Sequence, residues 1–213
     1  MSKSPSYKPI KSDDLKKFLM GIQKQCSEIL SVYREVPGRY LYRGFSSNPT
    51  AYFLKGVSPT NRMPTDMSYT VHSKLVHLFN KLGIKANRSN SIFCTTHGIT
   101  AQGHGPVYII FPINGFNYSW SRMAIDLFTA IETKGPFHIK FRDRMDIDDP
   151  RSVEEIQSKF QFTDNDLELA LQTYHEILIN GSYYAVRLSY VSYIAGDGIH
   201  KLKTFIETGE VPE

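Results

Sequence analysis

Two apolar runs separated by Asn180-Gly181 constrain the fold of this chain more than any other sequence feature. The first run is Ile-Leu-Ile at 177–179, and the second is Tyr-Tyr-Ala-Val at 183–186. An Asn-Gly pair readily adopts the two positive φ angles that a type I′ turn needs. The segment therefore predicts a β-hairpin with strands over 176–179 and 182–186.

Apolar spacing along the rest of the chain predicts both helices and strands. Spacings of three and four predict one helix over 11–35, with Ser12 as its N-cap and Pro37-Gly38 as its stop. Residues 46–66 are rich in Ser, Pro, Asn and Thr and predict a long loop. The other expected elements are helices over 67–82, 121–132, 151–159 and 164–172, and strands over 39–45, 91–96, 107–111 and 136–142. This order indicates an α+β fold with an antiparallel or mixed sheet.

Length and composition favour one domain that needs no disulfide or metal to stay folded. The chain has 213 residues and only two cysteines, Cys26 and Cys94, which excludes a disulfide framework and a four-cysteine zinc site. It contains no apolar run of about 18 residues, so we expect no membrane span. Residues 1–14 are polar and lysine-rich, unlike a secretory signal, and we expect a cytoplasmic location. The net charge of +4 allows a phosphate-bearing ligand or nucleic acid without indicating either.

Several common catalytic and cofactor motifs are missing from the sequence. It has neither a P-loop nor a G-x-G-x-x-G fingerprint. His97 and His104 lack carboxylates or cysteines at metal-ligand spacing, so no metal is expected. Cys94 and His97 lie three residues apart on one expected strand, which directs their side chains to opposite faces and argues against a cysteine nucleophile. Cys26 falls within the apolar stripe of the first helix and is expected in the core.

Three polar sites interrupt or end the apolar segments. Arg43 lies on an otherwise apolar or aromatic strand, and Gly44 leaves the backbone beside it approachable, which suits a phosphate or carboxylate. Thr95 and Thr96 end a strand, where hydroxyl groups either position a sugar or cap the next helix. Glu176 opens an apolar strand, where a carboxylate is either exposed or partnered and functional. The alternative for Arg43 is a purely structural role, in which it pairs with an acidic residue.

Together these segments resemble the arginine–serine–glutamate branch of the ADP-ribosyltransferase superfamily. The resemblance rests on Tyr-Arg-Gly at 42–44, on Phe-Cys-Thr-Thr at 93–96 and above all on Glu-Ile-Leu-Ile-Asn-Gly-Ser-Tyr-Tyr-Ala-Val at 176–186. It spans roughly residues 40–190, and the middle of the chain also resembles small phage proteins of that fold. It implies an ADP-ribosyltransferase-like split mixed or antiparallel sheet in a single domain. That domain would comprise a helical prelude over 1–38, an NAD-cleaving core over 39–190 and a C-terminal extension over 191–213.

The resemblance implies a mono-ADP-ribosyltransferase that uses NAD as a substrate and releases nicotinamide. Its acceptor would be a host protein or a nucleic acid, in the host cytoplasm if the chain is phage-encoded. Arg43, with Gly44 beside it, would hold the NAD phosphates or the nicotinamide ribose. Thr95 and Thr96 would occupy the Ser-Thr-Ser position of the family, which leaves open which hydroxyl takes the serine's role. Glu176 would bind the ribose 2′-hydroxyl and stabilise an oxocarbenium-like transition state.

The chain also departs from the family pattern. Members that modify arginine usually carry Glu or Gln two residues before the catalytic glutamate, and here that position is Tyr174. An arginine acceptor is therefore disfavoured, and Tyr174 would instead stack on an acceptor base or side chain. Arg62 and Arg88 are further candidates for binding phosphates, against a role in exposed salt bridges. We also expect one aromatic side chain to stack on nicotinamide, from the group Tyr108, Phe116, Tyr118 and Trp120.

Three alternatives keep other activities open. The first is a non-catalytic module of the same fold that binds a nucleotide or a partner protein. The second is a nucleic-acid-directed ADP-ribosyltransferase, which the mild basicity and Tyr174 favour weakly. The third is an unrelated α+β domain in which Glu176 is only a strand-start residue.

Overall fold

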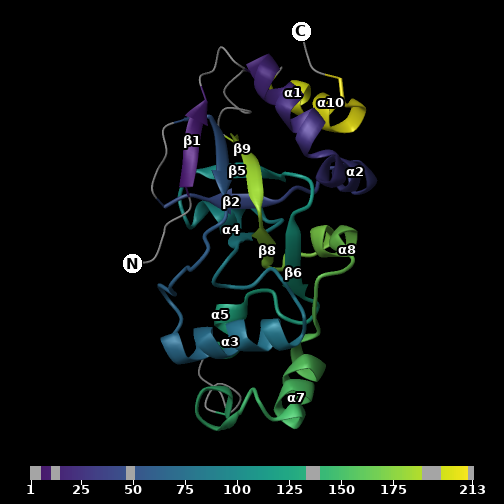
Figure 1. The fold of residues 1–213 in the computed structure, drawn as a ribbon. Coiled ribbons are helices and arrows are strands. Elements are labelled where there is room, and N and C mark those ends of the chain that lie inside the picture. The colour runs from purple at the N-terminus through teal and green to yellow at the C-terminus, as the bar shows by residue number, and fades with distance from the viewer. Residues whose placement is uncertain (1–5, 11–14, 47–50, 133–139, 189–197, 211–213) are drawn as a thin grey trace.

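The computed structural model describes residues 6–10, 15–46, 51–132, 140–188 and 198–210. In this part of the chain, nine strands form two sheets (Figure 1). Sheet A has the strand order β1-β3-β9-β5-β2, and sheet B has the order β4-β8-β6-β7. Every neighbouring pair in both sheets is antiparallel. The α+β class expected from the sequence is confirmed.

Strands and helices are interspersed along the chain. The strands are β1 (Ser6–Ile10), β2 (Tyr42–Gly44), β3 (Phe53–Val57), β4 (Ile92–Cys94), β5 (Val107–Pro112), β6 (Asn117–Ser121), β7 (Phe162–Thr163), β8 (Ile177–Asn180) and β9 (Ser182–Arg187). The helices are α1 (Leu15–Gln25), α2 (Ser27–Glu35), α3 (Tyr69–Lys81), α4 (Gly98–Gln102), α5 (Leu127–Glu132), the π-helix η2 (Lys140–Arg144), α7 (Pro150–Phe160), α8 (Leu167–Gln172) and α10 (Gly198–Thr208).

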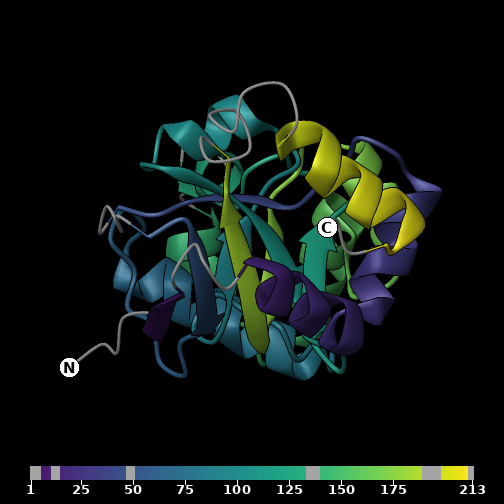
Figure 2. The same cartoon turned by 90° about the horizontal axis from the view of Figure 1, so that it is seen from above.

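Helices cover the two ends of the molecule. Helices α1, α2 and α10 lie at one end, and α3, α5 and α7 lie at the other (Figure 1). Figure 2 views the molecule from the end that carries α1 and α10. Apolar faces of α1, α2 and α10 enter the same hydrophobic cluster as the strands of sheet A, so these terminal helices are integral to the core. A second cluster joins α3, α5, η2 and α7.

Strand β8 contributes to both hydrophobic clusters. Ile177 and Ile179 belong to the cluster that contains sheet A, whereas Leu178 between them belongs to the other cluster. Side chains on a strand alternate between its two faces, so successive residues of β8 enter different cores. Sheet B is consequently covered on both faces, and the three residues that follow Glu176 are buried.

The predicted hairpin at Asn180-Gly181 is wrong. Strand β8 pairs with β4 and β6 in sheet B, while β9 pairs with β3 and β5 in sheet A. Gly181 has a φ of +135°, but Asn180 does not adopt the positive φ that a type I′ turn requires. The Ser58 hydroxyl accepts hydrogen bonds from the Asn180 side chain at 3.2 Å and from the Gly181 amide at 3.0 Å. These contacts make Asn180-Gly181 a corner at which the chain passes from one sheet to the other.

Strand β3 lies inside the segment 46–66, which the sequence analysis expected to be a loop. Its residues Phe53 and Leu54 are fully buried, and it pairs with β1 and β9. Gly56 is needed there because a Cβ atom would lie 2.5 Å from the ring of Tyr183. The strand depends on pairing partners far away in the chain, so local composition did not reveal it.

Three other predicted elements also differ. The helix expected over 11–35 breaks at Cys26, because the carbonyl of Gln25 accepts a hydrogen bond from the amide of Asn114 at 2.7 Å. Residues 117–121 form β6, so the helix expected over 121–132 begins only at Leu127. Residues 140–142 belong to η2 rather than to a strand. The expected N-cap Ser12 and residues 136–139 lie outside the described residues. The remaining predicted elements are confirmed: β2, α3, β4 and α8 have shorter bounds than expected, and β5 and α7 have slightly longer ones.

Candidate functional site

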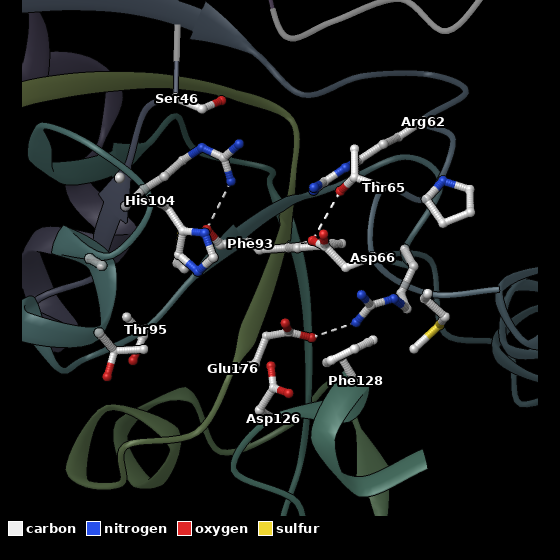
Figure 3. Close-up of a pocket in the computed structure, with 18 of the residues that line it drawn as sticks. Ser46, Arg62, Thr65, Asp66, Phe93, Thr95, His104, Asp126, Phe128 and Glu176 are labelled. Carbon is white, nitrogen blue, oxygen red and sulfur yellow. Dashed lines mark hydrogen bonds and ion pairs between the residues drawn. The ribbon is translucent and has the colours of Figure 1, made fainter. Parts of the chain in front are cut away.

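A pocket of about 720 Å³ opens where the two sheets meet (Figure 3). A two-residue bridge joins the sheets there: the amide of Tyr42 donates to the carbonyl of Thr95 at 2.7 Å, and the reverse bond is 2.9 Å. This bridge brings the arginine strand β2 beside the end of β4. Glu176 reaches the same pocket from the start of β8, which pairs with β4.

The pocket collects all but one of the predicted site residues. The lining includes Arg43, Gly44, Arg62, Arg88, Thr95, Tyr174 and Glu176. Thr96 is buried outside the lining, and its hydroxyl donates to the carbonyl of Thr173. Of the two candidate hydroxyl groups, only that of Thr95 is therefore placed to meet a ligand. The chemical roles of the lining residues stay predictions.

Glu176 is nearly buried and forms an ion pair with Arg88. The Nη1 atom of Arg88 lies 2.8 Å from Oε1 of Glu176, and the two side chains are 8% and 12% exposed. Burial raises the pKa of Glu176, the charge of Asp126 raises it further, and Arg88 and Arg62 lower it. Oε2 accepts no hydrogen bond from the described residues, so one carboxylate oxygen is held and the other is available to a ligand.

Phe93 contacts all three arginines that line the pocket. The guanidinium carbons of Arg62 and Arg88 lie 3.8 and 4.5 Å from the centroid of its ring. Nη1 of Arg43 donates a hydrogen bond of 2.9 Å to its carbonyl oxygen. Cation–π contacts favour such packing of cations around an aromatic ring. One residue of β4 thus gathers three positive charges at the wall of the pocket.

These arginines retain unused hydrogen-bond donors. Nε of Arg43, Nη1 of Arg62 and Nε of Arg88 are buried without a hydrogen-bond partner among the described residues. Burial, and then the charges of Arg43 and Arg88, lower the pKa of Arg62 to about 10. Arg62 is therefore still protonated at neutral pH. Buried donors without partners are costly, and an anionic ligand would satisfy them.

Thr95 and Cys94 behave differently although they are neighbours. The Thr95 hydroxyl accepts a hydrogen bond from the amide of His97 at 3.2 Å, but the N-cap of α4 is His97, so Thr95 does not cap that helix; Thr95 instead lines the pocket. Burial raises the pKa of the Cys94 thiol to about 12. The thiol is therefore protonated at neutral pH, which agrees with the prediction that it is not a nucleophile.

Tyr174 lies at the rim of the pocket. Its side chain is 52% exposed, and its ring meets His97 edge-on with the centroids 5.0 Å apart. The guanidinium carbon of Arg39 lies 5.4 Å from the centroid of the same ring. An exposed aromatic ring held by two neighbours can contact a second molecule at the pocket mouth.

The expected nicotinamide-stacking aromatics are not in the pocket, so that prediction is wrong. Tyr108 and Trp120 are buried in the core, and Phe116 and Tyr118 pack against it. Phe93, Asp126 and Phe128 also line the pocket, and the sequence assigned a role to none of them. Phe93 lies in the Phe-Cys-Thr-Thr motif at 93–96, so this motif was the signal that could have identified it. Asp126 and Phe128 enter from a helix whose start was misplaced.

Other searches of the structure and the chain were negative. Within the described residues, no group of three or more His, Cys, Asp or Glu side chains is arranged to hold a metal ion. No helix in the described ranges has the length and apolar character of a membrane span. Comparison with protein-family models, curated proteins and solved structures found no match to the chain.

Proposed function

We propose that this protein is an NAD-dependent mono-ADP-ribosyltransferase that transfers ADP-ribose to a macromolecular acceptor and releases nicotinamide. The observation that carries the proposal is that Arg43, Thr95 and Glu176 line one pocket although they are distant in the sequence. The volume of about 720 Å³ lies in the range of pockets that hold small molecules and cofactors. The fold is proposed to be the split-sheet fold of that superfamily.

The arginines would bind the pyrophosphate of NAD. Arg43 and Arg62 carry buried donors without partners, and no carboxylate forms a salt bridge with either in the described part of the chain. Guanidinium groups match phosphate oxygens in charge and geometry. Arg88 already pairs with Glu176, so it is a less direct candidate for phosphate binding than the sequence suggested.

Glu176 would promote cleavage of the glycosidic bond. As the bond from C1′ to the nicotinamide nitrogen breaks, its electron pair leaves with nicotinamide and positive charge develops on the ribose. A fixed carboxylate in a largely dry site stabilises that charge, and one such preorganised group is worth about 3–4 kcal/mol. The Thr95 hydroxyl at the same pocket would orient the ribose.

The mouth of the pocket supports a macromolecular acceptor. Four lining residues are large, apolar or aromatic and exposed: Met63, Ile125, Phe128 and Tyr174. Exposed apolar patches mark surfaces that contact other macromolecules. Among the described residues that line the pocket there is no lysine, whereas protein surfaces that bind nucleic acids depend on exposed basic side chains. These features favour a protein acceptor over RNA or DNA.

The test is incubation of the protein with NAD, with free nicotinamide measured by chromatography. We expect release by the wild type and a loss of about 100-fold in Glu176→Gln, with the NAD dissociation constant little changed. Labelled NAD offered with protein, RNA and DNA fractions then identifies the acceptor class. Binding of NAD without nicotinamide release would instead support a non-catalytic module, and an unchanged rate in Glu176→Gln would refute the role of this residue.

A further inference from the structure

A second carboxylate, that of Asp126, lies beside Glu176. The amide of Glu176 donates a hydrogen bond of 2.7 Å to the carbonyl of Ile125, which places Asp126 next to Glu176. The side chains of Asp126 and Glu176 both point into the pocket (Figure 3). The two residues are 50 positions apart in the sequence, so only the tertiary structure pairs them.

Asp126 is held in place by one oxygen and leaves the other available. Its Oδ1 atom accepts a hydrogen bond of 2.6 Å from the amide of Thr129, in the first turn of α5. Its Oδ2 atom accepts no hydrogen bond from the described residues. The half-buried side chain is fixed in direction, as a group that receives a proton must be.

The two carboxylates are in different electrostatic environments. Glu176 forms a salt bridge with Arg88, whereas Asp126 forms none with any residue that the structure describes. Arg88 occupies one oxygen of Glu176, and in the proposed role the other oxygen binds the ribose 2′-hydroxyl. Asp126 keeps Oδ2 open while a backbone amide orients it, so Asp126 is the carboxylate placed to receive a proton from an acceptor.

We propose that Asp126 is the general base of the reaction, a role that rests on the function proposed above. In a ribose whose 2′-hydroxyl binds Glu176, C1′ is the carbon next to the one that carries this hydroxyl, and Asp126 lines the same pocket. The C1′–nitrogen bond breaks and its electron pair leaves with neutral nicotinamide. The acceptor oxygen or nitrogen forms a bond to C1′, and the proton it loses passes to Asp126 and then to water.

Asp126→Asn is the test variant, because asparagine retains the oxygen that accepts from Thr129 and is as good an N-cap as aspartate. Asp146→Asn is the matched control, since it removes the same charge from an exposed residue outside the pocket lining whose Oδ1 atom also accepts a backbone hydrogen bond. The reaction measured is nicotinamide release from NAD with water as the acceptor, and then with sodium azide added. Azide carries no proton to lose and bypasses a general base.

We expect nicotinamide release to water to fall about 100-fold or more in Asp126→Asn with the NAD dissociation constant unchanged, and to stay at the wild-type rate in Asp146→Asn. Azide should restore release in Asp126→Asn, with ADP-ribosyl azide detected by mass spectrometry, but not in Glu176→Gln. An unchanged rate in Asp126→Asn, or a lowered rate that azide does not restore, overturns the role of Asp126 alone. A wild type that releases no nicotinamide overturns the proposed function as well.

Discussion

At the scale of single residues, the ionisation of Glu176 depends on its ion pair with Arg88. Burial raises the pKa of the Glu176 carboxyl above its ordinary value of 4.5, and Arg88 opposes that rise. Arg88 is itself held over the Phe93 ring. The ionisation of the proposed catalytic carboxylate therefore depends on a positioning residue contributed by a different segment.

The first prediction concerns the pH dependence of nicotinamide release. The proposed role needs an ionised Glu176, so the rate should fall as the pH falls through its raised pKa, at a pH above 4.5. Arg88→Met removes a cation that lowers this pKa. In this variant the acid limb of the pH–rate profile, where the rate falls with falling pH, should therefore lie at higher pH. Single-turnover rates across pH, and direct NMR titration of Glu176, check both expectations; an identical limb in the two proteins would contradict them.

The second prediction concerns stability. Arg88→Met leaves a nearly buried carboxylate without its cation, which costs about 3–5 kcal/mol at neutral pH. Because the folded-state pKa of Glu176 is raised, folding disfavours its ionised form. The loss of stability is therefore present above the folded-state pKa and disappears below the pKa of Glu176 in the unfolded chain. Urea unfolding at neutral and acidic pH measures this, and the double variant with Glu176→Gln should recover most of the loss. A loss that does not depend on pH would point to packing instead.

At the scale of elements, α4 packs closely against the arginine strand β2. A Cβ atom on Gly44 would lie 2.1 Å from the carbonyl oxygen of Ala101 in α4, which is backbone and cannot turn aside. Gly44 therefore allows the helix to approach Arg43 and close one wall of the pocket.

The third prediction tests this contact. Gly44→Ala should destabilise the fold by about 1–3 kcal/mol through overpacking and should also weaken NAD binding, because Arg43 lies next to it. Gly98→Ala is the matched control, since nothing lies within 4 Å of the added Cβ atom at the start of α4. Calorimetric NAD binding and urea unfolding measure both effects. Equal stability and equal NAD affinity of the two variants would show that neither property depends on the close approach of α4 to β2.

At the scale of the whole molecule, β8 joins the two hydrophobic clusters. Its alternating side chains enter both, and α10 contributes Phe205 to the cluster that contains sheet A. Neither cluster can lose its part of β8 without affecting the other. We therefore expect the protein to unfold as one cooperative unit.

The fourth prediction follows from that shared strand. Leu178→Ala, in one cluster, and Phe205→Ala, in the other, should each lower stability by about 2–5 kcal/mol. Both should shift a single transition, seen at the same midpoint by circular dichroism and by fluorescence of Trp120, the only tryptophan. Separate transitions by the two probes would instead indicate two independently folding parts.

Most of the regular elements and most of the candidate site could be predicted from the sequence. Apolar periodicity located helices such as α3 and α7, because one face of each is buried along its length. Arg43 and Glu176 could be found because a charge within an apolar strand demands a partner or a function. Asp126 could not be found, since its approach to Glu176 depends on the path of the chain after β6.

The sequence by itself determined the α+β class, the buried segments and the charged residues available to a ligand. Only the tertiary structure decided that Asn180-Gly181 joins two sheets instead of closing a hairpin, and that Arg88 pairs with Glu176. The physical reason is the same in both cases. The hydrogen bond that the Ser58 hydroxyl accepts and the ion pair of Arg88 with Glu176 link residues 123 and 88 positions apart, and local propensity carries no information about such partners.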